Sequence, residues 1–193
     1  VKCAEQYYPE KLNQLSTCRS PQQMFGSLLK THYAKGQGLE RKDIFVVSVM
    51  PCTAKKFEAR RPEFTTAGVR DVDAVLTTQE LARMIKSAGI VFDELEEESF
   101  DSPFGLGTGA GVIYGASGGV ATAVVREASH ILGKKRVTDV ELQPVAELPG
   151  VRAAEIEIDG RKARLAVVSG LGNARRMIAA MDRGEAAYDI VEV

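Results

Sequence analysis

Short apolar runs alternate with amphipathic stretches in the first half of the chain, a pattern typical of an α/β domain. The apolar run at residues 44–47 predicts a buried strand within a longer strand over 42–50, and residues 73–77 predict a second strand. Apolar residues at helical spacing predict one helix from Ser20 to about Lys35 and another after Thr77.

The second half of the chain predicts an antiparallel unit added to this core. Asp159-Gly160 is a strong signal for a hairpin turn between two apolar or alternating strands. A helix over about 174–181 and a last strand over 189–193 follow. The expected fold class is therefore α/β, with a mixed, mostly parallel sheet or sheets flanked by helices and an added antiparallel hairpin. The strands expected around the turn cover residues 137–145, 153–158 and 163–168.

Two of the helices carry clear start signals. Ser20 is expected to cap the first helix, with Pro21 at its first position and Gln23 closing a capping box. Thr77 and Glu80 have the same capping-box spacing at the start of the second helix.

Length and charge exclude several classes of protein. The 193 residues suit one domain or two small lobes, with a break near 93–110 or 133–140. Because 25 basic residues balance 26 acidic ones, we expect neither nucleic-acid binding nor a polybasic membrane contact. No apolar run approaches the roughly 18 residues of a membrane span, and the first residues do not resemble a signal peptide.

The cysteines and histidines do not form a local ligand set. Cys3, Cys18 and Cys52 are odd in number and widely spaced, so we expect a reducing, cytoplasmic setting without a disulfide framework. His32 and His130 are isolated, and we interpret both as surface or packing residues.

The most informative stretch follows the first predicted strand, where open α/β sheets place their ligand sites. Met50-Pro51-Cys52 ends the strand, and Lys55 and Glu58 would share one face of a following helix. Cys52 is either a buried structural residue or a thiolate that a nearby cation or a metal keeps deprotonated.

Three later segments each leave two interpretations. The acidic run at 93–98 is a solvated loop or helix end, or a surface that docks a basic partner. Gly105 to Ala110 fits a relaxed nucleotide-binding pattern, but an acidic, proline-containing segment precedes it where that loop needs a strand. At 115–120, Ser117 is expected to cap a helix whose N-terminus either binds an anion or simply packs closely.

Three blocks in order resemble the active-site domain of iron-only (FeFe) hydrogenases. These blocks are residues 15–26, 50–58 and 109–120, and the second reads Met-Pro-Cys-x-x-Lys-x-x-Glu. The family's Thr-Ser-Cys-Cys-Pro motif is expected just before Val1, and its Cys-x-x-x-Cys motif just after Val193. The chain thus resembles the middle of the domain, cut between its outer motifs.

The resemblance implies a cofactor, the H-cluster, in which a four-iron four-sulfur cluster is linked to a two-iron subcluster. Cys52 is implied as one of four cysteine ligands of the four-iron cluster, which suits a soft metal centre. Lys55 would donate to a cyanide ligand, and Met50 would pack beside the two-iron centre. Glu58 is expected to pair with a neighbouring basic group and fix the loop.

Further site residues follow from the same resemblance. Ser16 would relay protons, Gln22 would face the diatomic ligands, and Tyr114 would stand where the family more often has Phe. Cys18 is interpreted as a buried structural residue and Cys3 is unexplained. The residues expected to line the cluster pocket are Pro21, Tyr114, Gly115 and Ser117.

The implied function is reversible reduction of protons to H₂ by the intact parent enzyme. Because the chain holds one of four ligands, the fragment alone is expected to be inactive and free of cluster. Implied partners are cluster maturation proteins and an electron carrier such as ferredoxin or an NAD(P)-linked subunit. The alternatives are an iron–sulfur assembly protein, a sensor of H₂ and a plain nucleotide-binding domain.

Overall fold

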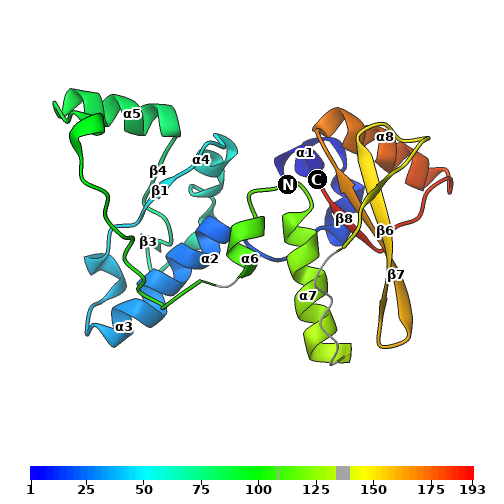
Figure 1. The fold of residues 1–193 in the computed structure, drawn as a ribbon, viewed down its shortest axis with the longest axis horizontal. Helices are drawn as coiled ribbons and strands as arrows, with labels where there is room; N and C mark the ends of the chain where they lie inside the picture. Colours follow the sequence, from blue (N-terminus) through cyan, green and yellow to red (C-terminus); the bar gives the residue numbers. More distant parts are fainter. Residues whose placement is uncertain (108, 134–139) are drawn as a thin grey trace. The chain divides into compact units, whose positions relative to one another are not determined.

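The computed structural model describes residues 1–107, 109–133 and 140–193, and it divides the chain into two compact units. Unit 1 comprises Val1–Phe104 and unit 2 comprises Gly105–Val193 (Figure 1). Each unit is described by itself. Among the described residues, no helix has the length and apolar character needed to span a bilayer.

One helical segment dominates unit 1. Helix α2 (Pro21–Leu28) continues through a π-helical turn, η2 (Leu29–Tyr33), into α3 (Ala34–Gly36). As expected, Ser20 caps its start, accepting the backbone N–H of Gln23. This helix packs closely on the loop at residues 71–72, since a Cβ on Gly26 would lie 2.6 Å from the Asp71 carbonyl oxygen.

The strands of unit 1 are shorter than the hydrophobic pattern predicts. Strand β1 (Val47–Val49) pairs in parallel with β4 (Ala74–Leu76). The predicted strand over 42–50 is wrong in extent, because Arg41–Asp43 form a 3₁₀ turn and Phe45 is 73% exposed. Packing here depends on a small core of Val46, Ala59 and Val72, against which Leu29, Ile44 and Val75 lie.

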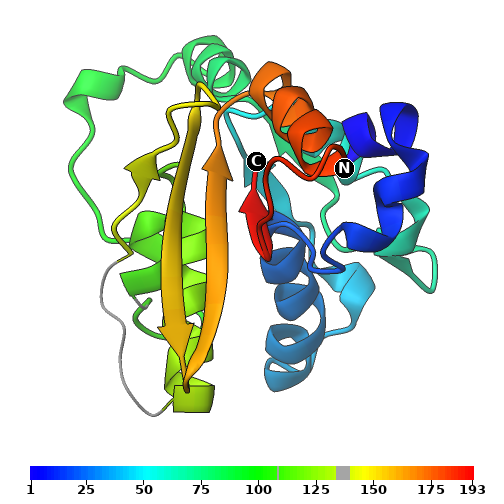
Figure 2. The same ribbon diagram turned by 90° about the vertical axis from the view of Figure 1, so that its right-hand side faces the viewer.

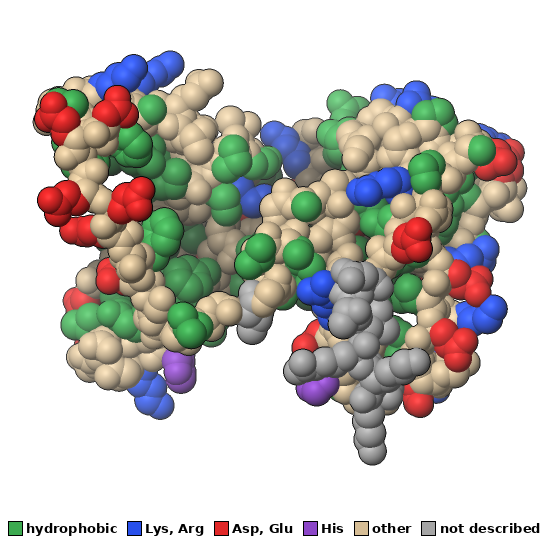
Figure 3. All heavy atoms as spheres, in the orientation of Figure 1, with side chains coloured by type: hydrophobic (Ala, Val, Ile, Leu, Met, Phe, Trp, Pro, Cys, Tyr) green, Lys and Arg blue, Asp and Glu red, His purple; other side chains and the backbone are tan. Residues whose placement is uncertain are grey.

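Helix α5 (Thr78–Ser87) begins with the predicted capping box. The Thr77 hydroxyl accepts the Glu80 N–H at 3.1 Å, and the Glu80 carboxylate accepts the Thr77 N–H at 2.8 Å. Acidic side chains gather on the segment that follows this helix (Figure 3), and residues 93–98 are exposed. The remaining elements of unit 1 are α1 (Lys2–Tyr7), η1 (Pro9–Gln14), η3 (Arg41–Asp43), α4 (Ala54–Glu58), η4 (Pro62–Phe64), β2 (Thr65–Thr66), β3 (Val69–Arg70) and η5 (Phe92–Glu94).

Unit 2 is built on a mixed sheet in the order β5-β6-β7-β8 (Figure 2). Strands β6 and β7 form the predicted antiparallel hairpin, and Asp159 and Gly160 turn it with φ values of 52° and 75°. Residues 137–139 of the predicted strand over 137–145 lie outside the described residues. The strands are β5 (Gln143–Pro144), β6 (Val151–Ile158), β7 (Arg161–Val168) and β8 (Ile190–Glu192).

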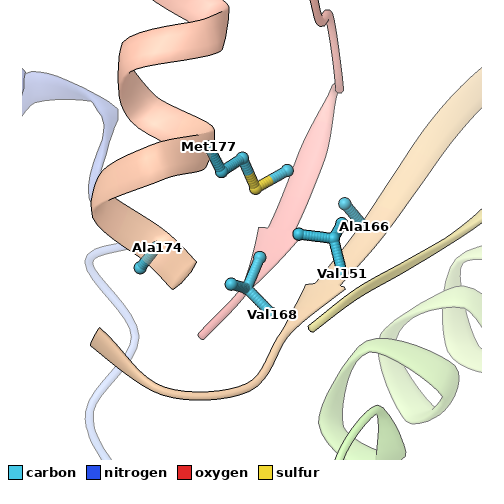
Figure 4. Packing of buried hydrophobic residues seen from close by; sticks show 5 residues of the cluster. All are labelled: Val151, Ala166, Val168, Ala174 and Met177. Carbon is cyan, nitrogen blue, oxygen red and sulfur yellow. The ribbon is translucent and has the colours of Figure 1, made fainter. Parts of the chain in front are cut away.

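Helices α7 (Gly119–Gly133) and α8 (Leu171–Asp182) cover opposite faces of this sheet. Successive strand residues point to opposite faces, so β7 supplies both cores. Leu165 and Val167 pack against α7, whereas Ala166 and Val168 pack against Met177 of α8 (Figure 4). Strand β8 pairs in parallel with β7, and a short helix, α6 (Gly109–Ile113), precedes α7. The predicted mixed α/β class is confirmed.

Candidate functional site

Cys52 lies in a turn that leaves the carboxyl end of β1. The Met50 N–H donates to the Leu76 carbonyl at 2.8 Å, extending the pairing with β4 by one residue. The chain then turns into α4, and the Lys55 N–H donates to the Cys52 carbonyl at 3.2 Å. Met50 is half-buried and Cys52 is exposed. The thiol is therefore presented at the end of a strand, not enclosed in a core.

Glu58, at the end of α4, joins this turn to the start of α2. Its Oε2 accepts the Ser20 hydroxyl at 2.7 Å and the Gln22 side-chain amide at 3.0 Å. The expectation that Glu58 pairs with a basic group is wrong for the described residues, because its partners are two neutral donors. Their positions at the helix start could not be inferred from the spacing within residues 50–58.

Gln22 is buried at this junction. Its side chain is 6% exposed, and its Nε2 also donates to the Lys55 carbonyl at 3.3 Å. Its Oε1 is buried and has no hydrogen-bond partner in the described part of the chain. Gln23 is fully buried with both side-chain polar atoms similarly unpaired, so the expected capping box at Ser20 is wrong in its second half.

Two adjacent lysines of α4 differ in their surroundings. The Lys56 ammonium binds the Glu80 carboxylate at 2.7 and 2.9 Å. This ion pair, together with the capping bond from Thr77, lowers the pKa of Glu80 to about 2. Lys55 is half-buried, and within the described residues its ammonium has no ion-pair or hydrogen-bond partner. Among the described residues, Lys55 is therefore a cation close to Cys52 in sequence that remains available.

The segment before α2 is open to solvent. Ser16 is exposed, and its hydroxyl accepts the Cys18 N–H at 3.1 Å. Cys18 is also exposed, so its interpretation as a buried structural residue is wrong. Cys3 is half-buried, and Pro21 takes the expected first position of α2.

A buried charge that the sequence analysis did not identify anchors this segment. Asp71 is 1% exposed and accepts hydrogen bonds from both Arg19 and Arg41, the latter at 2.6 Å. A buried carboxylate requires such partners because desolvation disfavours its charged form. The pair with Arg19 fixes the chain immediately before Ser20.

In unit 2, the glycine-rich turn leads into α7 without the expected serine cap. The Ser117 hydroxyl lies 3.4 Å from that of Ser169, and the Glu192 carboxylate accepts the N–H groups of Gly118 and Ala121, each at 2.7 Å. The predicted Ser117 cap is wrong, because the side chain of Glu192 caps the helix instead. Glu192 lies 74 and 71 residues along the chain from the two N–H groups that it accepts. Tyr114, Gly115 and Ser117 are all exposed.

The donor set determines which part of a metal centre the chain can supply. Across the described residues, no group of three or more His, Cys, Asp and Glu could hold a metal ion. His32 lies near the Phe104 ring, with centroids 6.2 Å apart, and His130 is exposed. Counting only partners in the described part of the chain, the exposed Cys52 thiol, the unpaired Lys55 ammonium and the buried, unpaired amide oxygen of Gln22 in α2 fit one edge of a larger centre.

Comparison with known proteins identifies the family of the chain. The sequence model described as "Iron only hydrogenase large subunit, C-terminal domain" matches residues 1–193. Iron hydrogenase 1 of Clostridium pasteurianum is 46% identical over 100% of the chain and 34% of its own length. The NADP-reducing hydrogenase subunit HndD of Solidesulfovibrio fructosivorans is 42% identical over 98% of the chain and 32% of its own length.

A solved structure agrees with these matches. A variant of the FeFe-hydrogenase HydA1 from Chlamydomonas reinhardtii matches with a TM-score of 0.85 and 33% identity, over 99% of this chain and 56% of that one. Cytosolic iron-sulfur assembly component 3 of Rattus norvegicus is also similar, with 37% identity over 93% of the chain and 39% of its own length.

These findings define an α/β protein of the iron-only hydrogenase type. The chain belongs to the family of the iron-only hydrogenase large subunit, C-terminal domain. It spans about a third of the length of the first two curated relatives. The predicted resemblance is confirmed.

Proposed function

We propose that this chain is part of an enzyme that catalyses the reversible reduction of protons to H₂. The bound cofactor would be the H-cluster, whose two-iron subcluster supplies the site at which protons and electrons combine. Cys52 contributes one of the four thiolates that hold the four-iron cluster, in keeping with the preference of such clusters for cysteine.

Lys55 is the residue that supports this proposal most directly. Burying an ammonium without a partner is unfavourable, yet the half-buried Lys55 has none among the described residues, while its neighbour Lys56 is paired. A compact ammonium at this point suits an anionic acceptor such as iron-bound cyanide. Met50 packs beside the two-iron subcluster, where its thioether is a polarizable neighbour.

Other residues shape the surroundings of the cofactor. Ser16 passes protons through its exposed hydroxyl, and Gln22 keeps an unpaired Oε1 in a buried position. Pro21 in unit 1 and, in unit 2, Tyr114, Gly115 and Ser117 are each proposed to contact the cofactor. Glu58 acts indirectly, because its contacts with Ser20 and Gln22 hold the start of α2 against α4.

The two adjacent lysines provide a matched test in the natural full-length protein. We expect Lys55→Ala to reduce H₂ turnover to background, because it removes the free cation beside Cys52. Lys56→Ala should retain turnover, since it removes a partly exposed ion pair with Glu80 and leaves Lys55 in place. Equal turnover in the wild type and Lys55→Ala would contradict the proposal.

A second candidate function is iron–sulfur cluster binding in assembly, without H₂ turnover. The 37% identity to cytosolic iron-sulfur assembly component 3 supports it. Under this alternative, Lys55→Ala would matter little, because no cyanide ligand needs its charge. Iron retention together with absent H₂ turnover in the wild type would favour this alternative.

The ligand count gives a further expectation for the 193 residues made alone. One thiolate at Cys52 cannot retain a four-iron cluster against exchange, since such clusters take four cysteine ligands. We propose that this piece carries no cluster and has no hydrogenase activity. Finding stoichiometric iron and sulfide in the purified piece would contradict this.

The partners are also proposals. The similarity to an NADP-reducing hydrogenase subunit supports an NAD(P)-linked electron carrier, and ferredoxin is the other carrier we propose. Maturation proteins would install the cofactor. A cytoplasmic location remains our proposal.

A further inference from the structure

The start of α7 is held by a carboxylate from the last strand of the sheet. Glu192 ends β8, and its two carboxylate oxygens accept the N–H groups of Gly118 and Ala121, one oxygen each. The first N–H groups of a helix lack partners within the helix. A carboxylate is favourable there because of the helix dipole.

A second contact holds the same turn from the neighbouring hairpin. Arg152 of β6 donates from its guanidinium to the Ser117 carbonyl at 2.9 Å. The turn is therefore held on both sides of the peptide between Ser117 and Gly118, its carbonyl by Arg152 and its N–H by Glu192. The sheet determines where this turn lies.

Glycine is required where these contacts bring the backbone close together. Gly118 has a φ of 93°, and a Cβ on it would lie 2.8 Å from Leu142 Cδ1. A Cβ on Gly119 would overlap the Ile113 carbonyl group, 2.6 Å from its carbon. The preceding residues, Tyr114 to Ala116, consequently have little freedom to shift against α7.

We propose that Glu192 is a positioning residue, which fixes the exposed Tyr114–Ser117 segment and fills the anion-binding start of α7 with its own carboxylate. This inference rests on the proposed function. Because Glu192 occupies the start of α7, the cofactor would contact the Tyr114–Ser117 segment and not the positive end of the helix dipole. Glu192 itself touches no cofactor under this proposal.

Hydrogen exchange tests the cap without requiring any cofactor. In the natural full-length protein prepared without cluster, Glu192→Ala should accelerate exchange of the Gly118 and Ala121 amides by about fivefold, the effect of losing a typical helix cap. Glu192→Gln keeps one acceptor oxygen and should protect one of the two amides. Glu185→Ala is the control, because it removes an exposed carboxylate paired with Arg183. Unchanged exchange in Glu192→Ala would contradict the cap.

The positioning role has a separate readout in the cluster-loaded protein. We expect Glu192→Ala to retain iron and to shift or broaden the infrared bands of the cyanide ligands, with partial rescue in Glu192→Gln. Identical infrared bands in the wild type and Glu192→Ala would contradict the positioning role, even where exchange confirms the cap. Absence of such bands from the wild type would contradict the proposed function and leave the exchange result to decide the cap.

Discussion

Carboxylates hold two turns in different ways: the Cys52 turn of unit 1 (residues 50–53) and the glycine turn of unit 2 (residues 114–118). Glu58 accepts two side-chain donors, Ser20 Oγ and Gln22 Nε2. Glu192 instead accepts two backbone N–H groups, those of Gly118 and Ala121. The contacts of Glu58 require particular side chains on both the donor and the acceptor residues. The contacts of Glu192 require a carboxylate as the acceptor, and positions without side chains around the backbone donors.

This difference affects how each turn tolerates substitution. Backbone donors persist whatever residue carries them, so the glycine turn is sensitive mainly to added bulk. Side-chain donors disappear on substitution, so the Cys52 turn is sensitive mainly to lost hydrogen bonds. The two units also differ in how far their strands are buried. Strand β7 is buried on both faces, while β1 retains exposed Val47 and Val49.

Added bulk at the glycine turn should give the largest effect on stability. Gly119→Ala places a methyl group on the Ile113 carbonyl group, and we expect a loss of about 3 kcal/mol, at the upper end of overpacking effects. Gly111→Ala is the matched control, because its Cβ would meet open space within a helix, and it should be neutral or stabilising. Denaturant unfolding measures both. Similar unfolding midpoints would contradict this account.

Removing the acceptor at the Cys52 turn should have an intermediate effect. Glu58→Ala leaves the buried Gln22 amide with one weaker acceptor, and we expect a loss of about 1.5–3 kcal/mol, the range for hydrogen bonds to charged groups. Glu63→Ala is the control, because it removes an exposed partner of Arg61. Thermal unfolding of the two variants should separate them, and an equal loss in both would show that Glu58 makes no special contribution.

The smallest effect should come from the ion pair that links α4 to α5. The pKa of Glu80 lies at about 2 in the folded chain, against an ordinary value of 4.5. Its contribution is therefore present above pH 4.5 and is lost as the pH falls from 4.5 towards 2. Glu80→Gln should weaken the acid dependence of stability in that interval. An unchanged pH profile in this variant would show that solvent screening cancels the pair.

The elements predicted correctly depend on local signals. The caps at Ser20 and Thr77, the turn at Asp159-Gly160 and the alternation of strands and helices each lie within a few residues of sequence. Such signals act between neighbours along the chain, so a single sequence contains them. The resemblance to the hydrogenase family likewise depended on short continuous blocks.

The errors concern contacts between distant residues. The partners of Glu58 and the cap of α7 are set by side chains 36 to 74 residues away, and no spacing rule indicates them. Cys18 was expected to be buried on the general tendency of free cysteine, yet the segment before α2 lies on the surface. Strand β1 is shorter than its apolar run because no strand among the described residues covers Phe45.

We propose above all that Cys52 is a cluster ligand, and the iron content of variants tests this claim. Cys52 and Cys18 are both exposed, so Cys52→Ala and Cys18→Ala form a matched pair in the natural full-length protein after cluster loading. We predict that Cys52→Ala loses most of its iron and sulfide, while Cys18→Ala retains the wild-type amounts. Equal iron and sulfide in the two variants would contradict the claim.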